Sequence, residues 1–193
     1  MNIEYEATFI NINKDEMRRK LKDAGAVLVR PEFLQRRIPF FLPDGDRTSA
    51  KYVRVRDEGD KITLSFKIID GDKIENQREL CLEVNSFDGA VELLGLIGCE
   101  PKSYQESRRE LWRLDEVDIT IDEWPFLEPF VEVEGKFALE VQKVSEKIGF
   151  DYSQALFCGV TKLYILKYNL PYSVINTVPR LVFDMGNPFL NMV

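Results

Sequence analysis

The first residues of the chain alternate between apolar and polar side chains without a break. Positions 3, 5, 7 and 9 are Ile, Tyr, Ala and Phe, whereas the positions between them are Glu4, Glu6 and Thr8. A period of two predicts a β-strand with one buried face. The neighbouring carboxylates of Glu4 and Glu6 repel each other unless a cation lies between them or both are fully hydrated. The pattern therefore raises the question of what lies beside this pair.

Five more segments alternate in the same way and predict further strands: 51–56, 62–67, 76–84, 117–122 and 130–134. Three other segments have an extended character, with Pro31 and Pro39 as interruptions: 27–29, 33–42 and 104–114. Turn signals rich in Gly, Pro and Asp occur at 43–46, 57–60 and 70–72. The chain is thus predicted to be rich in antiparallel strands.

Three segments have the apolar spacing of amphipathic helices. They cover about residues 14–23, 87–97 and 137–147, and each is followed by a glycine. Asn13 and Ser86 are predicted N-caps of the first two. A further helical segment is predicted over about 153–168. We expect residues 1–175 to form one domain, and residues 176–193 to be a tail that packs irregularly on the body or on a partner.

The polar faces of the strands permit two interpretations. They are solvated in an open sheet, or they line the inside of a closed one. Bases occur on the middle strands and acids on the first and late ones, which differs from a scattered surface mixture. The amphipathic helices also need apolar surface to cover, and the outside of a barrel would supply it. We therefore predict an α+β fold, a barrel with a polar lumen and helices packed outside.

The composition of the chain limits which classes of binding partner and which cellular compartment are expected. The 193 residues are 45% hydrophobic and 31% charged, with a net charge of −7. This charge argues against general binding to nucleic acids or anionic membranes. No apolar run of about 18 residues is long enough to span a membrane, and the N-terminus lacks the pattern of a signal peptide. Three isolated cysteines fit a reducing compartment. We expect a cytoplasmic protein.

The sequence contains no histidine. This excludes nucleophilic sites of the Ser-His and Cys-His types and every metal site with histidine ligands. A metal would be bound by oxygen atoms, which favours magnesium, manganese or calcium. Arginine and lysine side chains that face carboxylates inside a barrel suit a polyanion bridged by divalent cations. Phosphoryl transfer needs little more than such positioning and charge stabilisation. No glycine-rich phosphate loop is present.

The order of these motifs resembles that of the CYTH domains of the triphosphate tunnel metalloenzymes, over about residues 1–170. The family includes class IV adenylyl cyclases, thiamine triphosphatases and inorganic triphosphatases. The segments that carry the resemblance are Glu4 to Thr8, Arg54 to Arg56, Thr63 to Lys67, Glu79 to Glu83, Ser107 to Trp112, Asp118 to Glu123, and Phe130 to Glu134.

The resemblance implies an eight-stranded antiparallel β-barrel that forms a tunnel for a triphosphate and for Mg²⁺ or Mn²⁺. The implied metal ligands are Glu4, Glu6, Asp122, Glu132 and Glu134. The implied phosphate-binding residues are Arg54, Arg56, Lys67, Arg108, Arg109 and Lys162. Catalysis would depend on Glu4, Glu6 and Lys67. Thr8, Glu79, Glu83 and Asp118 would line the tunnel.

Three positions depart from the family pattern. Thr8 stands where the opening motif has lysine, Ser107 stands where a lysine is expected near Arg109, and residues 35–40 lack an expected acid. The implied activity is metal-dependent hydrolysis of inorganic triphosphate, a nucleoside triphosphate such as ATP, or thiamine triphosphate. The alternatives are an adenylyl cyclase that makes cyclic AMP from ATP, a non-catalytic triphosphate-binding protein, and a structural β-domain with a solvated charged face. A homodimer is compatible with the sequence.

Overall fold

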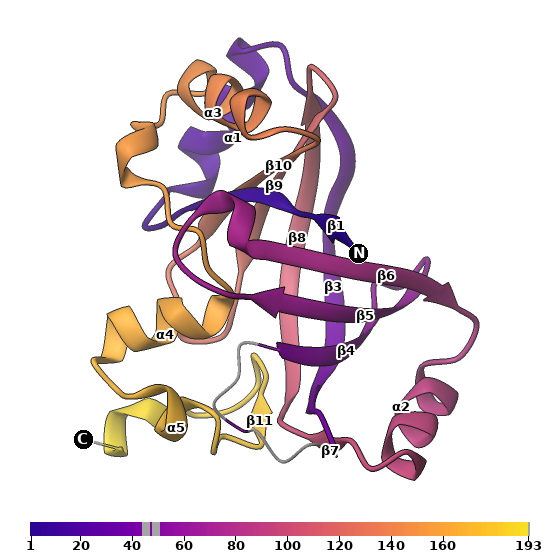
Figure 1. Ribbon diagram of the computed structural model, residues 1–193. Helices are drawn as coiled ribbons and strands as arrows, with labels where there is room; N and C mark the ends of the chain where they lie inside the picture. Colours follow the sequence, from indigo (N-terminus) through magenta and orange to yellow (C-terminus); the bar gives the residue numbers. More distant parts are fainter. Residues whose placement is uncertain (44–46, 48–50, 193) are drawn as a thin grey trace.

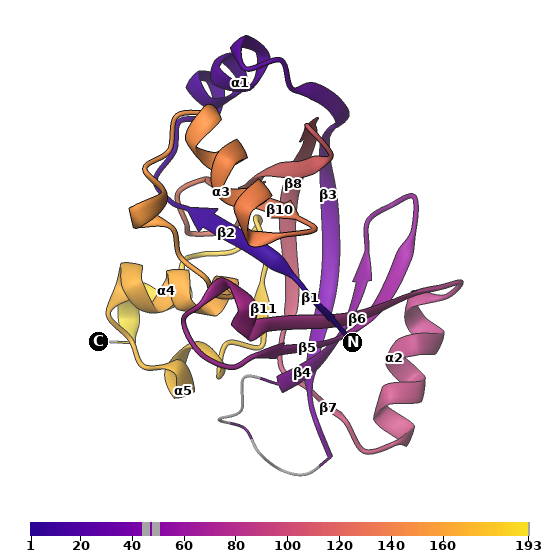
Figure 2. The ribbon, with the colours of Figure 1, turned by 45° about the horizontal axis from the view of Figure 1, so that its top comes forward.

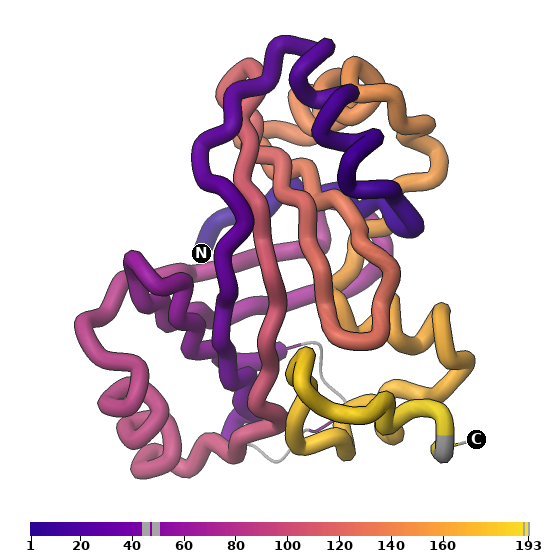
Figure 3. Tube along the Cα trace, turned by 180° about the vertical axis from the view of Figure 1, so that it is seen from behind, coloured from indigo at the N-terminus to yellow at the C-terminus, as the bar shows by residue number. Residues whose placement is uncertain are grey.

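The computed structural model describes residues 1–43, 47 and 51–192. Most of the turn predicted at 43–46 lies outside the described residues. The long strands β3 (Val27–Phe41) and β8 (Tyr104–Leu114) run antiparallel along the barrel, as Figures 1 and 3 show. The other strands around the barrel are β1 (Asn2–Ile3), β2 (Tyr5–Phe9), β4 (Lys51–Asp57), β5 (Ile62–Ile69), β6 (Gln77–Val84), β9 (Val117–Glu123) and β10 (Phe130–Gly135).

The hydrogen-bonded order of the described strands is β1-β6-β5-β4-β3-β8-β9-β10-β2, and each neighbouring pair is antiparallel. The first and last strands in this order follow one another in the chain, with only Glu4 between them. The sheet therefore curls into a nearly closed barrel whose described strands occupy eight positions. This confirms the predicted fold. Two short strands add to the rim, because β7 (Glu100–Pro101) pairs with β3 and β11 (Arg180–Leu181) pairs with β8.

The prediction of one unbroken strand over residues 3–9 is wrong at Glu4. There the chain leaves β6 and joins β10, so the alternation continues while the pairing partner changes. The Glu4 N–H donates to the carbonyl of Gln77 at 3.0 Å, and the Gln77 side chain donates to the carbonyl of Glu6 at 2.9 Å. We call residues 4–6 the seam of the barrel. Ile3, predicted to be buried, is 43% exposed beside it.

Three helices lie outside the strands, where the alternation leaves apolar surface. Helices α1 (Lys14–Asp23) and α3 (Ala138–Lys147) gather at one end of the barrel, and α2 (Phe87–Leu96) lies toward the other (Figure 1). The predicted caps are confirmed, because the side chains of Asn13 and Ser86 each accept a backbone N–H at 3.0 Å. Helices α1 and α3 pack against apolar residues of β2, β9 and β10, such as Val131 and Ile119.

Residues 27–41 form one strand, although the sequence predicted two extended pieces. The pairing of β3 with β8 shifts register between Leu28 and Arg30 and again between Arg30 and Phe33. Pro31 lies inside these irregularities, where the missing N–H removes no regular ladder bond. The strand therefore continues past a proline that normally interrupts a sheet.

The helix predicted from about residue 153 begins later. A 3-10 turn, η2 (Tyr152–Gln154), precedes an extended stretch, and helix α4 covers Val160–Tyr168. In the extended stretch, Leu156 exchanges two backbone hydrogen bonds with Thr8, each 2.9 Å long. A short helix, α5 (Tyr172–Ile175), follows α4. The bridge to Thr8 replaces helical hydrogen bonds and brings α4 to the barrel.

The tail folds onto the body. It contains β11 and the 3-10 turn η3 (Pro188–Asn191), and Figure 2 shows it gathered beside α4 and α5. Phe189 is 0% exposed and packs against Tyr164 and Tyr168, with ring centroids 5.0 and 4.8 Å apart. Among the described residues, no helix is long and apolar enough to span a membrane.

The packing of the tail predicts the effect of Phe189→Ala. Removing a fully buried aromatic ring should lower the free energy of unfolding by about 3–5 kcal/mol. The neighbouring Leu190, which is 69% exposed, provides the control, and Leu190→Ala should change it by less than about 0.5 kcal/mol. Urea unfolding of both variants measures the difference. Equal stability of the two variants would contradict a tail that is part of the folded core.

Candidate active site

The barrel encloses a cavity of about 270 Å³ that is lined mainly by charged side chains. The alternation of the strands explains this, since the polar face of each strand turns inward. On β5, for example, Thr63, Ser65 and Lys67 are buried, whereas the apolar residues between them are only half-buried on the outside. Charged residues predicted from the sequence that line this cavity are Glu4, Glu6, Arg54, Arg56, Lys67, Glu79, Arg109, Glu132 and Glu134.

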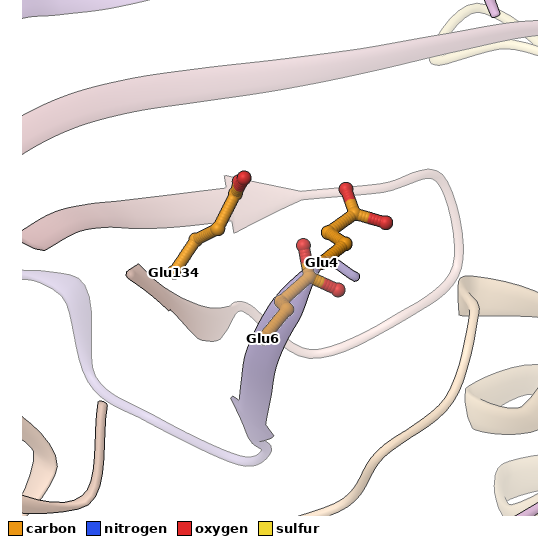
Figure 4. Close-up of side chains that lie close together, drawn as sticks. All are labelled: Glu4, Glu6 and Glu134. Atoms are coloured by element: carbon orange, nitrogen blue, oxygen red, sulfur yellow. The ribbon is translucent and has the colours of Figure 1, made fainter. Parts of the chain in front are cut away.

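Three carboxylates meet at the seam. Glu4 lies at the seam itself, Glu6 on β2 and Glu134 opposite Glu6 on β10. One oxygen from each lies within 4.8 Å of the others, and Figure 4 shows the three side chains converging. Desolvation and repulsion from Glu132 and Glu4 raise the pKa of Glu6 well above its usual range. Desolvation and Glu4 raise the pKa of Glu134 to about 7.

These observations test whether the three carboxylates suit a metal ion. Their donors are all oxygen atoms, which hard divalent cations prefer. Burial, together with the neighbouring carboxylates, disfavours the charged forms of Glu6 and Glu134, and a bound cation would offset both effects. The set therefore fits a divalent cation with a preference for oxygen ligands. Glu4, Glu6 and Glu134 are three of the five residues predicted as metal ligands.

Lys67 connects this cluster to the bases on β4. Its ammonium lies 2.7 Å from Glu4 and 3.6 Å from Glu79, and Arg54 lies 3.2 Å from Glu79. Although burial opposes the charge, Glu4 raises the pKa of Lys67. Burial also opposes the charge of Glu79, but Lys67 and Arg54 lower its pKa to about 2. Arg54, Lys67 and Glu79 are therefore charged together inside the barrel.

Arg109 on β8 is held by the other two predicted metal ligands. It forms two hydrogen bonds with Asp122, at 2.7 and 2.8 Å, and one with Glu132 at 2.5 Å. Asp122 is 0% exposed and also accepts a hydrogen bond from Thr120. Asp122 thus orients Arg109 and lies outside the three-carboxylate cluster. Burial and repulsion from Asp122 raise the pKa of Glu132, which does line the cavity.

Several predicted residues lie elsewhere. Asp118 is near the turn between β8 and β9, where it forms an exposed ion pair with Arg113 at 2.7 Å, so its predicted place in the tunnel is wrong. Glu83 is also exposed, at the end of β6, and does not line the cavity. Arg108 points outward, as the alternation implies, and pairs with Glu123. Thr8 is buried, but it does not line the cavity.

A second cavity of about 350 Å³ adjoins the first, and we call it the side pocket. The two cavities share lining residues, including Tyr52, Arg54 and Trp124. Side chains from α4, α5 and the loop before α4 line much of the rest, among them Phe157 and the exposed Lys162, which was predicted to bind phosphate. The side pocket is therefore more aromatic and apolar than the barrel cavity.

Among the lining residues that sequence reasoning missed, Arg37, Tyr52 and Trp124 border both cavities. Tyr52 lies on the same face of its strand as Arg54, and Arg37 lies on the same face as Gln35. The alternation therefore indicated the direction of both side chains. Trp124 follows β9 in a loop, where no period indicates the direction of a side chain. The aromatic wall of the site was for this reason not predictable from alternation.

Comparison with known families identifies the fold. The sequence model of the CYTH domain matches residues 2–163. The chain belongs to the CYTH domain family. This confirms the resemblance drawn from the motifs. No curated protein matches the sequence of this CYTH protein.

Solved structures show the same fold at low sequence identity. The protein PH1012 of Pyrococcus horikoshii is 23% identical, with a TM-score of 0.68, over 83% of this chain and 98% of its own. A candidate adenylate cyclase of Vibrio parahaemolyticus is 14% identical, with a TM-score of 0.72, over 84% and 98%. The candidate adenylyl cyclase HpAC1 of Hippeastrum, described as having a dominant triphosphatase activity, is 16% identical, with a TM-score of 0.60, over 88% and 98%.

Lys102, in the side pocket of this CYTH protein, predicts a dependence of stability on pH. Its ammonium lies 4.5 Å from the centre of the Phe41 ring, and burial lowers the pKa of Lys102 to about 8. An unfolded lysine has a pKa of about 10.4. Between these values the unfolded chain binds more protons than the folded chain, so this residue makes stability rise with pH.

Lys102→Met should therefore be more stable than the wild type at pH 7, and the difference should shrink between about pH 8 and 10.4. Unfolding in urea at pH 7 and pH 9.5 measures it. Lys22→Met, at an exposed position of α1, removes the same charge and should leave the pH dependence unchanged. A constant difference between Lys102→Met and wild type across this range would contradict the prediction.

Proposed function

We propose that this chain hydrolyses the terminal phosphoryl group of a triphosphate bound in the barrel cavity, with Mg²⁺ or Mn²⁺ held by Glu4, Glu6 and Glu134. The observation that carries the proposal is the arrangement of charge inside one cavity. Three carboxylates converge at the seam, and bases from β4, β5 and β8 reach the same space. Triphosphates and divalent cations together match both sets of charge.

The bases have the geometry to bind phosphate oxygens. Arg54, Arg56 and Arg109 present guanidinium groups, which suit bidentate contacts with phosphate. The Nε atoms of Arg54 and Arg56 are buried without a hydrogen-bond partner in the described structure, which supports a missing anion. Without a ligand, Arg54 donates to Glu79 and Arg109 donates to Glu132. A bound triphosphate would accept hydrogen bonds from these guanidinium groups instead. Asp122 would keep Arg109 in place during this exchange.

In this proposal, Glu4, Glu6 and Lys67 are the catalytic residues. Because its ammonium contacts Glu4, Lys67 lies next to the cluster and would contact a phosphate bound there. Glu4 and Glu6 would hold the cation against that phosphate. When bound, a divalent cation would neutralise phosphate charge and make water a better nucleophile. The reacting phosphoryl group is therefore expected at the seam end of the cavity.

The side pocket favours a second candidate, a cyclase that makes cyclic AMP from ATP. Its aromatic lining next to the phosphate-binding bases would accept the organic part of a nucleotide or of thiamine triphosphate. A non-catalytic triphosphate-binding protein is the third candidate. It is supported by Thr8, because the base of the family motif is missing there. The similarity to a candidate cyclase with dominant triphosphatase activity supports hydrolysis as the first.

Product analysis tests these candidates. With Mg²⁺ or Mn²⁺, we expect orthophosphate from tripolyphosphate, ATP or thiamine triphosphate, and no release when the metal is chelated. Cyclic AMP and pyrophosphate from ATP would support the cyclase instead. No product, together with a metal-dependent rise in melting temperature on addition of tripolyphosphate, would indicate a binding protein. Absence of both binding and products would refute a triphosphate site.

The double variant Glu4→Gln/Glu6→Gln tests the assignment of the carboxylates. Losing two ligands should weaken metal-dependent binding of tripolyphosphate by at least about tenfold, measured by calorimetry in Mn²⁺. The control is Glu83→Gln/Asp118→Asn, which removes two exposed carboxylates of the same kind and should bind normally. Circular dichroism checks that both variants fold. Similar affinities in the two variants would rule out a metal site at the seam.

A further inference from the structure

Arg37 differs from the other bases of the cavity. It lies on β3, is only 5% exposed, and lines both the barrel cavity and the side pocket. In the described part of the chain, each predicted base of the barrel cavity has a carboxylate within 4.0 Å: Arg54, Arg56, Lys67 and Arg109. The described structure gives Arg37 no such partner. A buried charge without a counter-ion is rare and costly.

The groups that do contact Arg37 are neutral. Its guanidinium donates to the side chains of Gln35 and Ser107, and it stacks over the ring of Trp124 at 4.4 Å. Its Nε atom is buried and has no hydrogen-bond partner in the described structure. Neutral acceptors and an aromatic face orient a guanidinium, but they leave its charge uncompensated. The fork is thus held in position with part of its donor capacity free.

Neighbouring charges make this position worse for a cation. Arg37 lies directly opposite Arg56 in the sheet register, and like charges in that relation destabilise a sheet. Burial, followed by repulsion from Arg54, Arg56 and Arg109, lowers the pKa of Arg37 well below its usual range, and Asp122 offsets this only in small part. An anion placed among these arginines would be attracted by all of them.

The position of Arg37 indicates which part of a ligand it would bind. Glu4 and Glu6 lie at the seam, whereas Arg37 and Trp124 border the side pocket. A phosphate next to Arg37 would therefore be the one farthest from the seam carboxylates. In an organic triphosphate, this is the phosphate that joins the organic group in the side pocket.

We propose that Arg37 is a substrate-binding residue that anchors the phosphate at the side-pocket end of the triphosphate. The proposal rests on the proposed function. It also offers a source for the positive charge that Thr8 does not supply, since Arg37 adds one base to the cavity from a different strand. In the absence of ligand Arg37 costs stability, and that cost disappears when phosphate binds.

The test compares Arg37→Met with Arg36→Met. Arg36 is the adjacent residue on β3, but it points outward and pairs with Asp57 at the surface. Both variants remove one positive charge and keep an unbranched side chain. Calorimetry with tripolyphosphate in Mn²⁺ gives the affinity, and thermal unfolding without ligand gives the melting temperature.

We expect Arg37→Met to weaken tripolyphosphate binding by about tenfold or more, the effect of losing hydrogen bonds to a charged group, while Arg36→Met stays within about twofold of wild type. The ligand-free melting temperature of Arg37→Met should equal or exceed that of wild type. A lower affinity without a lower melting temperature would show that Arg37 contributes to ligand binding and not to the stability of the fold. If Arg37→Met does not fold, Arg37→Lys replaces it and should still bind more weakly than wild type, because it lacks the bidentate fork.

Two results would overturn the proposal. One is an affinity in the Arg37 variant equal to that of Arg36→Met. The other is a loss of affinity together with a melting temperature several degrees below wild type, which would make Arg37 a structural support for Gln35, Ser107 and Trp124. Wild-type protein that does not bind tripolyphosphate with metal would instead refute the proposed function itself, so the two failures are distinguishable.

Discussion

The ion pairs of Lys67 with Glu4 and Glu79 hold charge inside the barrel, where the three side chains are largely buried. Lys67 and Glu79 would each be costly alone, because burial opposes the charged forms of both. Together they allow the polar faces of the strands to turn inward. The apolar faces then lie outside, where α1, α2 and α3 cover part of them. The positions of the helices therefore follow from the charges in the lumen.

This relation explains why much of the fold could be predicted from the sequence. Alternation identifies the two faces of a strand, and the segregation of acids and bases among the strands favours the closed sheet. On β4 and β5 the inward residues Arg54, Arg56 and Lys67 were found in this way. Alternation carries no information about pairing partners, however. The change of partner at Glu4 was missed because the residues on both sides of it keep the same period.

Other errors have a different physical origin. The segment around Leu156 has residues compatible with a helix, but its backbone bonds with Thr8 override that local tendency. Asp118 shares a face with Asp122, yet it lies at the start of β9, beyond the cavity. Trp124 lies in a loop without a period. Local patterns thus give the direction of a side chain, whereas its depth in the barrel and the contacts of loops depend on tertiary packing.

The seam also has a consequence for how the site comes into being. Glu4 lies between a strand that pairs with residues 78–79 and a strand that pairs with residues 131–135. These contacts are distant in sequence, so forming them closes long stretches of chain at a cost in conformational entropy. The carboxylate cluster therefore depends on both of these distant pairings. Metal binding at the seam would require the closed barrel and would in turn stabilise its closure.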